Sequence, residues 1–109
     1  MNSTSELMPA TAPAPGEILA MELSARGWSQ RQFARILGKP VQAVNEIVRA
    51  KKQITPETAL RIAAALGTSP ELWIGLEADY RLSIARSTLG QDILDEIADR
   101  RTQLQVELS

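Results

Sequence analysis

Apolar residues recur at spacings of three and four along most of the chain, which is the period of amphipathic helices. No segment shows the alternation that is typical of a strand. The pattern predicts helices over residues 15–26, 29–37, 40–50, 56–66, from 70 past 80, and from 89 to about 106. We therefore expect an all-α fold, with five helices in one domain over residues 15–86 and an additional C-terminal helix within residues 87–109.

Capping residues place the helix boundaries. Ser29 and Gln32 have the spacing of a capping box, and Trp28 is placed to pack on Phe33 as a hydrophobic staple. Gly27, Gly38 and Gly67 follow helices at positions that favour a left-handed C-cap. Thr55 and Ser69 each precede a proline and a glutamate, which is a typical helix start. In the helix over residues 56–66, Leu60, Ala63 and Leu66 are expected to face inward.

Two short helices joined around Gly38 form the motif that points to function. Ala34 is small where the helices over 29–37 and 40–50 must approach closely, and Val44, Ile47 and Val48 form an apolar row on the second helix. Together with Gln30, this is the layout of a helix-turn-helix, whose second helix enters the major groove of DNA.

Charge is unevenly distributed along the chain. Residues 26–52 hold seven basic residues and one acid, Glu46, whereas the rest of the chain holds five basic and twelve acidic residues. A basic segment of this kind favours a polyanionic partner, although a solvated basic face would give the same composition.

If the apolar row faces inward, the opposite face of the second helix is free to read bases. Gln42 can pair with adenine, Asn45 can contact adenine or a phosphate, and Val41 can touch a thymine methyl group. Glu46 can accept a hydrogen bond from cytosine or can instead pair with Arg49 or Lys39. The residues expected at phosphates are Gln30, Arg31, Lys39, Arg49, Lys51 and Lys52. The alternative for each is a solvated surface residue.

Composition argues against an enzyme. The chain has no Cys and no His, which removes thiolate nucleophiles, zinc–thiolate sites and the commonest general base, and no metal or other cofactor is expected. Asp92, Asp95, Glu96 and Asp99 share one helix, but such a run is usually a solvated face. Residues 1–14 read as a disordered tail, with folding on a partner as the alternative. No signal peptide or membrane span is present, so a cytoplasmic protein, on the nucleoid when bound to DNA, is expected.

Several motifs resemble HigA-type antitoxins, also called VapI-like or plasmid-maintenance antidote proteins, of the Cro/repressor-like helix-turn-helix superfamily. The resemblance covers about residues 15–86. It is carried by the segments 15–19, 29–38, 54–61 and 65–73. Ala14, Lys39-Pro40 and Ala50 depart from the family's usual His, Val-Ser and Gly, so the recognition helix starts within about one residue of Pro40. The resemblance implies a homodimer that binds double-stranded operator DNA, represses its own operon and neutralises a HigB-type mRNA-cutting toxin. A stand-alone transcriptional regulator is the alternative.

The C-terminal third offers candidate contacts for a second copy or for the toxin. These are Trp73, Tyr80, Leu94, Ile97 and Leu104. For Trp73, covering the core is the favoured alternative. For the row after Leu89, contact with a partner and packing within the chain both remain open.

Overall fold

The computed structural model describes residues 12–109, which fold into six α-helices with no strand among them. The helices are α2 (Pro15–Arg26), α3 (Gln30–Leu37), α4 (Val41–Val48), α5 (Pro56–Leu66), α6 (Pro70–Leu89) and α7 (Gln91–Leu108). The all-α fold with five helices and a further C-terminal helix is confirmed. The tail expected over residues 1–14 lies largely outside the described residues. Ala14, which is described, is buried and stands at the N-cap of α2.

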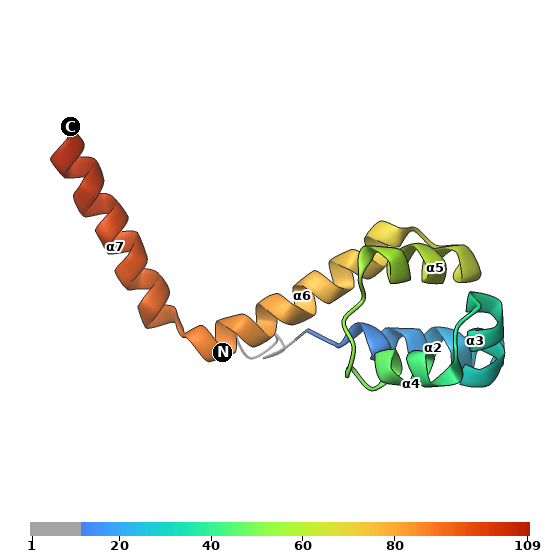
Figure 1. Cartoon of the computed structure of the whole chain (residues 1–109). Coiled ribbons are helices and arrows are strands. Elements are labelled where there is room, and N and C mark those ends of the chain that lie inside the picture. Colours follow the sequence, from blue (N-terminus) through green and yellow to red (C-terminus); the bar gives the residue numbers. More distant parts are fainter. Residues whose placement is uncertain (1–11) are drawn as a thin grey trace, which may run out of the picture.

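Helices α2 to α5 and the first turns of α6 enclose a single core (Figure 1). Its largest fully buried side chains are Trp73, Phe33, Leu19, Ile62 and Val44. The later part of α6 leaves this core, and α7 projects from its end. The molecule is consequently elongated, with extents of 60 × 38 × 22 Å. No helix in residues 12–109 has both the length and the apolar character needed to span a membrane.

The predicted capping residues form the hydrogen bonds that their spacing predicts. Ser29 Oγ accepts from the amide of Gln32 at 3.0 Å, and Gln32 Oε1 accepts from the amide of Ser29 at 2.8 Å. The Trp28 and Phe33 rings stack with their centroids 6.4 Å apart. These local interactions fix the start of α3, and the staple also joins it to the core, because Phe33 is fully buried there and Trp28 packs against it.

Two arginines donate hydrogen bonds to the carbonyls at the C-terminal ends of other helices, which the sequence pattern did not indicate. Arg26 donates to the carbonyl of Leu66 at 3.1 Å, and Arg61 donates to the carbonyl of Leu37 at 3.0 Å. Each guanidinium therefore satisfies a carbonyl that the helix end leaves without an intrahelical partner.

The inward row predicted for α5 is wrong in one position. Leu60 is 60% exposed, and the buried residues are Ala59, Ile62, Ala63 and Leu66. At 100° per residue, Leu60 lies roughly 120° around the helix from Leu66, whereas Ala59 lies within about 20° of it. The position of α5 on the core follows the row through Leu66, so a small alanine replaces the expected leucine inside.

Trp73 belongs to the core, which corrects its inclusion among the partner contacts. Its side chain is fully buried, and its indole N–H donates to Thr68 Oγ1 at 2.8 Å. A partner cannot reach it. Tyr80 is half-buried near the middle of α6, with the Arg81 guanidinium 5.1 Å from its ring centroid.

Candidate nucleic-acid interface

Helices α3 and α4 form the helix-turn-helix. Gly38 ends α3 in the left-handed region, at φ 71°, and Pro40 is the extended N-cap of α4, at φ −62° and ψ 149°. The recognition helix therefore begins at Val41. It ends at Val48, two residues before the expected end, because Ala50 adopts a left-handed backbone conformation at φ 60°.

The inner face of α4 is held from two sides. Val44 and Ile47 are buried against the core, and Val48 is half-buried beside them. Gly16, at the start of α2, approaches the far end of α4 so closely that a Cβ there would lie 2.1 Å from the carbonyl oxygen of Ile47. Only a residue without a side chain permits this contact, so α2 sets the position of the recognition helix through backbone atoms.

The outer face of α4 presents the side chains that the inward row left free. Val41 is 40% exposed, and Gln42 and Arg49 are also exposed. Asn45 is half-buried, and its Nδ2 donates to Oε1 of Gln30, the first residue of α3, at 3.2 Å. This bond fixes the Asn45 amide and leaves the side-chain nitrogen of Gln30 available as a donor at the same edge.

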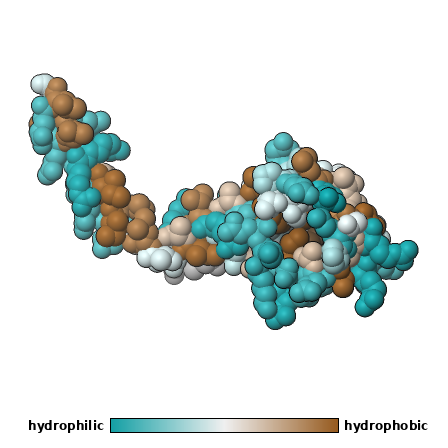
Figure 2. Space-filling view, viewed as in Figure 1, coloured by the Kyte–Doolittle hydropathy of each residue, from teal (hydrophilic) through white to brown (hydrophobic). Residues whose placement is uncertain are grey.

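A tight turn places two lysines at the end of the recognition helix. The amides of Lys51 and Lys52 both donate to the carbonyl of Glu46, at 2.8 and 3.2 Å. The chain consequently folds back after α4, and both lysine side chains are exposed. Arg31, in the first turn of α3, and Lys39, just before α4, are also exposed. Figure 2 shows hydrophilic side chains projecting from the lower edge of the molecule, where Figure 1 places α4.

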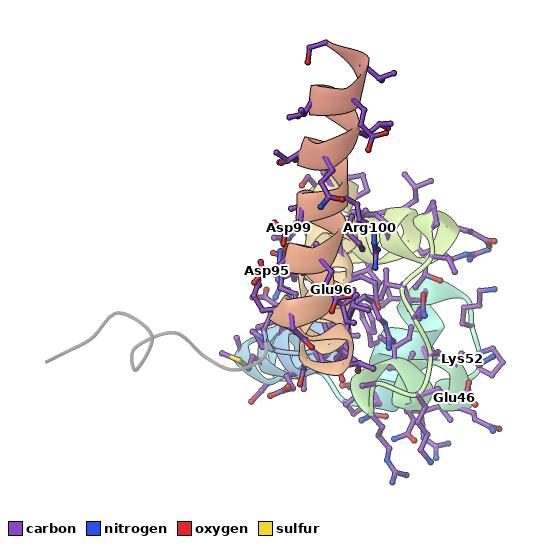
Figure 3. All side chains as sticks on the ribbon, turned by 90° about the vertical axis from the view of Figure 1, so that its left-hand side faces the viewer. Glu46, Lys52, Asp95, Glu96, Asp99 and Arg100 are labelled. Carbon is purple, nitrogen blue, oxygen red and sulfur yellow. The ribbon has the colours of Figure 1, made fainter. Side chains whose placement is uncertain are left out.

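Glu46 is half-buried on the recognition helix, on the same side of the molecule as Lys52 (Figure 3). In residues 12–109 it forms no ion pair, so the alternative pairing with Arg49 or Lys39 is absent there. A cleft of about 240 Å³ opens beside it, with Val44 and Ile47 in its lining and Lys52 and Arg61 among its polar groups. The cleft is smaller than the sites of roughly 300 Å³ or more that usually hold small ligands.

One residue that supports this face was missed by the pattern. Glu77, in α6, is a buried acid whose Oε1 accepts from the amide of Ile54, in the segment that follows the lysines. In the sequence, the one indication that Glu77 is buried is its position directly after the apolar Leu76, on a helix whose other face is solvated. That signal is too weak to distinguish it from a surface glutamate.

The comparisons with known proteins agree with this geometry. The model of the family described as helix-turn-helix matches residues 19–73, which span α3, α4 and α5. The chain belongs to the helix-turn-helix family. Among curated relatives of this helix-turn-helix protein, Virulence-associated protein I from Dichelobacter nodosus is 38% identical over 72 residues, covering 65% of this chain and 67% of that one.

Solved structures give the same family and narrow it to HigA-type antitoxins. A HigA-family addiction module antidote protein from Coxiella burnetii is 38% identical, with a TM-score of 0.74, over 79% of this chain and 95% of that one. The Pseudomonas aeruginosa antitoxin HigA, solved with the higBA promoter, is 34% identical, with a TM-score of 0.71, over 75% of this chain and 90% of that one. The resemblance to HigA-type proteins is thereby confirmed.

Proposed function

We propose that this helix-turn-helix protein is an antitoxin that binds operator DNA through the exposed face of α4 and represses its own operon. The observation that carries the proposal is the exposed outer face of α4, with Gln30 at one edge. At the end of α4 lies the turn that contains Lys51 and Lys52, here called the lysine turn. Similarity to the HigA antitoxin that was solved with its promoter supports promoter DNA as the partner.

The proposed contacts divide into two groups. Val41 and Gln42, which are exposed on the recognition helix, and Glu46, which is half-buried beside the cleft, read base edges in the major groove. Asn45, which is held by Gln30, contacts a base or a phosphate beside it. The remaining contacts are to phosphates and come from Gln30, Arg31, Lys39, Arg49, Lys51 and Lys52.

Operator binding is proposed to involve a homodimer, because a palindromic site matches the two-fold symmetry of two identical chains. Two recognition helices would then enter successive major grooves about 34 Å apart, one turn of DNA. A palindrome with half-sites spaced by one turn is therefore the expected target.

DNA binding is tested with duplexes from the promoter region of the protein's own operon. We expect fluorescence anisotropy to give much tighter binding to a palindrome in this region than to a scrambled duplex of the same length and composition. Equal affinity for both duplexes over a range of salt concentrations would show that the protein binds DNA without sequence preference, which would contradict the proposal.

The antitoxin role is tested separately. We propose that the protein neutralises a HigB-type toxin encoded beside it, and the similarity to HigA-type antitoxins supports this. Expression of the adjacent product should arrest growth, and co-expression of this chain should restore growth and yield a co-purifying complex. Specific operator binding without rescue or complex formation would favour the alternative, a stand-alone transcriptional regulator.

A further inference from the structure

Leu37, the last residue of α3, has a backbone carbonyl that the helix-turn-helix does not satisfy by itself. The residue three positions further on is Pro40, which has no N–H to donate. In residues 12–109, the donor to this oxygen is the guanidinium of Arg61, in α5, through Nη1 at 3.0 Å. A side chain from outside the motif therefore completes the end of its first helix.

The peptide unit that Arg61 holds belongs to the turn of the motif. The Leu37 carbonyl and the Gly38 amide share one plane, and this amide donates to the carbonyl of Arg35 at 3.3 Å. Gly38 is left-handed at φ 71°, and the chain then passes through Pro40 into α4. Rotation of the plane changes ψ of Leu37 and φ of Gly38, the dihedral angles that set the direction in which α4 leaves the turn. Arg61 thus holds a plane whose orientation determines that of the recognition helix.

Packing leaves α4 less constrained on the side that faces α5. Its main neighbours are α2 and α3, and toward α5 it borders the cleft of about 240 Å³. Ala43 and Ile47 line this cleft from α4, and Thr58 and Arg61 line it from α5. Close packing normally fixes one helix against another, and it is incomplete along this side of α4. The bond from Arg61 to the turn is a polar link from α5 to the motif at the edge of the cleft.

The guanidinium of Arg61 is itself held in place. Its Nε donates at 3.1 Å to Oε2 of Glu57, one turn earlier in α5, while its Nη1 donates to the Leu37 carbonyl. A planar guanidinium fixes the angle between these donors, so the bond to Glu57 directs the other donor at the turn. The Arg61 and Glu57 side chains are 40% and 70% exposed, and an exposed pair of this kind adds little to stability.

From these observations we propose that Arg61 is a positioning residue for operator recognition, which fixes the orientation of α4 by holding the carbonyl of Leu37. The inference rests on the proposed function, because this orientation matters only if the outer face of α4 reads bases. Without the bond, the turn populates further orientations, and the apparent operator affinity falls with the fraction of molecules that remain competent. Binding to DNA of any sequence depends mainly on charge and changes little.

Arg26 supplies a matched control. It donates to the carbonyl of Leu66 at 3.1 Å, and it pairs with Glu22 one turn earlier in its own helix. This arrangement repeats that of Arg61, but the peptide unit that it holds lies at the end of α5, outside the helix-turn-helix. The Arg26 guanidinium also lies 5.7 Å from the ring centroid of Trp28. A general loss of helix contacts should therefore be at least as large in Arg26→Met as in Arg61→Met.

The bond is tested first without DNA, by nuclear magnetic resonance of the full chain. A hydrogen bond to a carbonyl polarises the amide in the same peptide unit, so its loss moves the nitrogen chemical shift of that amide. In Arg61→Met the resonance of Gly38 should move and that of Gly67, which follows Leu66, should not. The reverse is expected in Arg26→Met. An unmoved Gly38 resonance in Arg61→Met would overturn the inference.

Operator recognition is tested with the same two variants by fluorescence anisotropy, at a temperature where circular dichroism shows both to be folded. Arg61→Met should raise Kd for the operator palindrome about tenfold, the factor that corresponds to one net hydrogen bond, and change Kd for the scrambled duplex little. Arg26→Met removes the same charge and should leave the preference for the operator unchanged. The two variants should share one slope of log K against log salt concentration, because neither arginine neutralises a phosphate.

Three results would overturn the inference. Equal losses on both duplexes in Arg61→Met, with a slope reduced by about 1, would place Arg61 at a phosphate. A preference that falls as far in Arg26→Met as in Arg61→Met would assign the effect to helix contacts in general. An Arg61→Met protein that keeps the full preference would show that the bond does not position α4.

Failure of this inference is distinguishable from failure of the proposed function. A wild-type chain that binds both duplexes equally would overturn both, whereas a wild-type preference that Arg61→Met retains would overturn this inference alone. Neither variant changes α7, where Leu94, Ile97 and Leu104 are exposed, so the candidate partner contacts on that helix are the same in every chain compared.

Discussion

The side chain of Glu77 holds the backbone of Ile54. Oε1 of this buried carboxylate accepts from the Ile54 amide at 2.9 Å, while Oε2 accepts from Nε of Arg81 at 2.6 Å. Ile54 is itself buried and lies between the lysine turn and α5. One carboxylate of α6 therefore satisfies a buried amide and fixes the segment that leaves the recognition helix.

Removing this acceptor should destabilise the protein. Glu77→Ala leaves the Ile54 amide buried without a partner, which costs about 2–3 kcal/mol in the free energy of unfolding. Glu77→Gln keeps an acceptor oxygen and should lose less. Asp79→Ala is the control, because Asp79 is an exposed acid on the same helix that forms no ion pair in residues 12–109, and its loss should change the free energy of unfolding by about 0.5 kcal/mol or less. Urea unfolding followed by far-ultraviolet circular dichroism measures all three variants, and equal losses in Glu77→Ala and Asp79→Ala would contradict this role for Glu77.

The close approach of α2 to α4 gives a second prediction. In Gly16→Ala the new methyl group would meet the carbonyl oxygens of Ile47 and Val48 at 2.1 and 2.5 Å, so one helix must shift. We expect a loss of about 1–3 kcal/mol in stability, the usual cost of overpacking, together with weaker operator binding because α4 moves.

Gly75→Ala provides the matched control for Gly16→Ala. Gly75 lies inside α6, and the methyl group of an alanine there would meet no side chain and no neighbouring helix within 4 Å. Alanine should therefore stabilise the protein by about 0.5–1 kcal/mol through helix propensity. Operator affinity should stay unchanged in this variant. A Gly16→Ala protein as stable as wild type, with full affinity for the operator, would show that the contact does not position α4.

The elements that depend on local chemistry were predictable from the sequence. The capping box at Ser29, the Trp28–Phe33 staple and the left-handed caps at Gly27, Gly38 and Gly67 all have the predicted geometry. Features that depend on tertiary packing could not be predicted from the sequence in the same way. The exposure of Leu60 follows from how α5 rotates onto the core, and the buried role of Glu77 follows from a backbone amide 23 residues away in sequence.

The candidate site also contains some features that the sequence predicts and others that it does not. The inward row of Val44 and Ile47 fixes the outer face of α4 through the helical period alone, so the exposed positions of Val41 and Gln42 could be predicted. The bond between Asn45 and Gln30 could not, because it depends on the side-chain conformers at the place where α3 and α4 cross. The early end of α4 depends on the left-handed backbone of Ala50, which residue type does not indicate.

Base reading by Gln42 gives a prediction that separates specificity from affinity. Gln42 is exposed on the second position of α4, so Gln42→Ala should weaken operator binding by about 1–3 kcal/mol while changing binding to scrambled DNA little. Gln103→Ala, a change of the same kind on an exposed position of α7, should leave both affinities unaltered. Fluorescence anisotropy on the two duplexes measures the ratio, and an equal loss on both would assign Gln42 to backbone contact instead.

The lysine turn should control the salt dependence of binding rather than sequence choice. A lysine that neutralises one phosphate contributes roughly 0.9 to the slope of log K against log salt concentration, because it releases condensed counterions. Lys52→Ala should therefore weaken binding to every duplex alike and reduce the slope by about 1, and Lys51→Ala should do the same. Arg86→Ala removes one positive charge from an exposed position on α6, outside the proposed interface, and should leave the slope close to that of the wild type. If Arg86→Ala lowers the slope as much as Lys52→Ala does, the effect reflects the net charge of the protein, and the two lysines are not at phosphates.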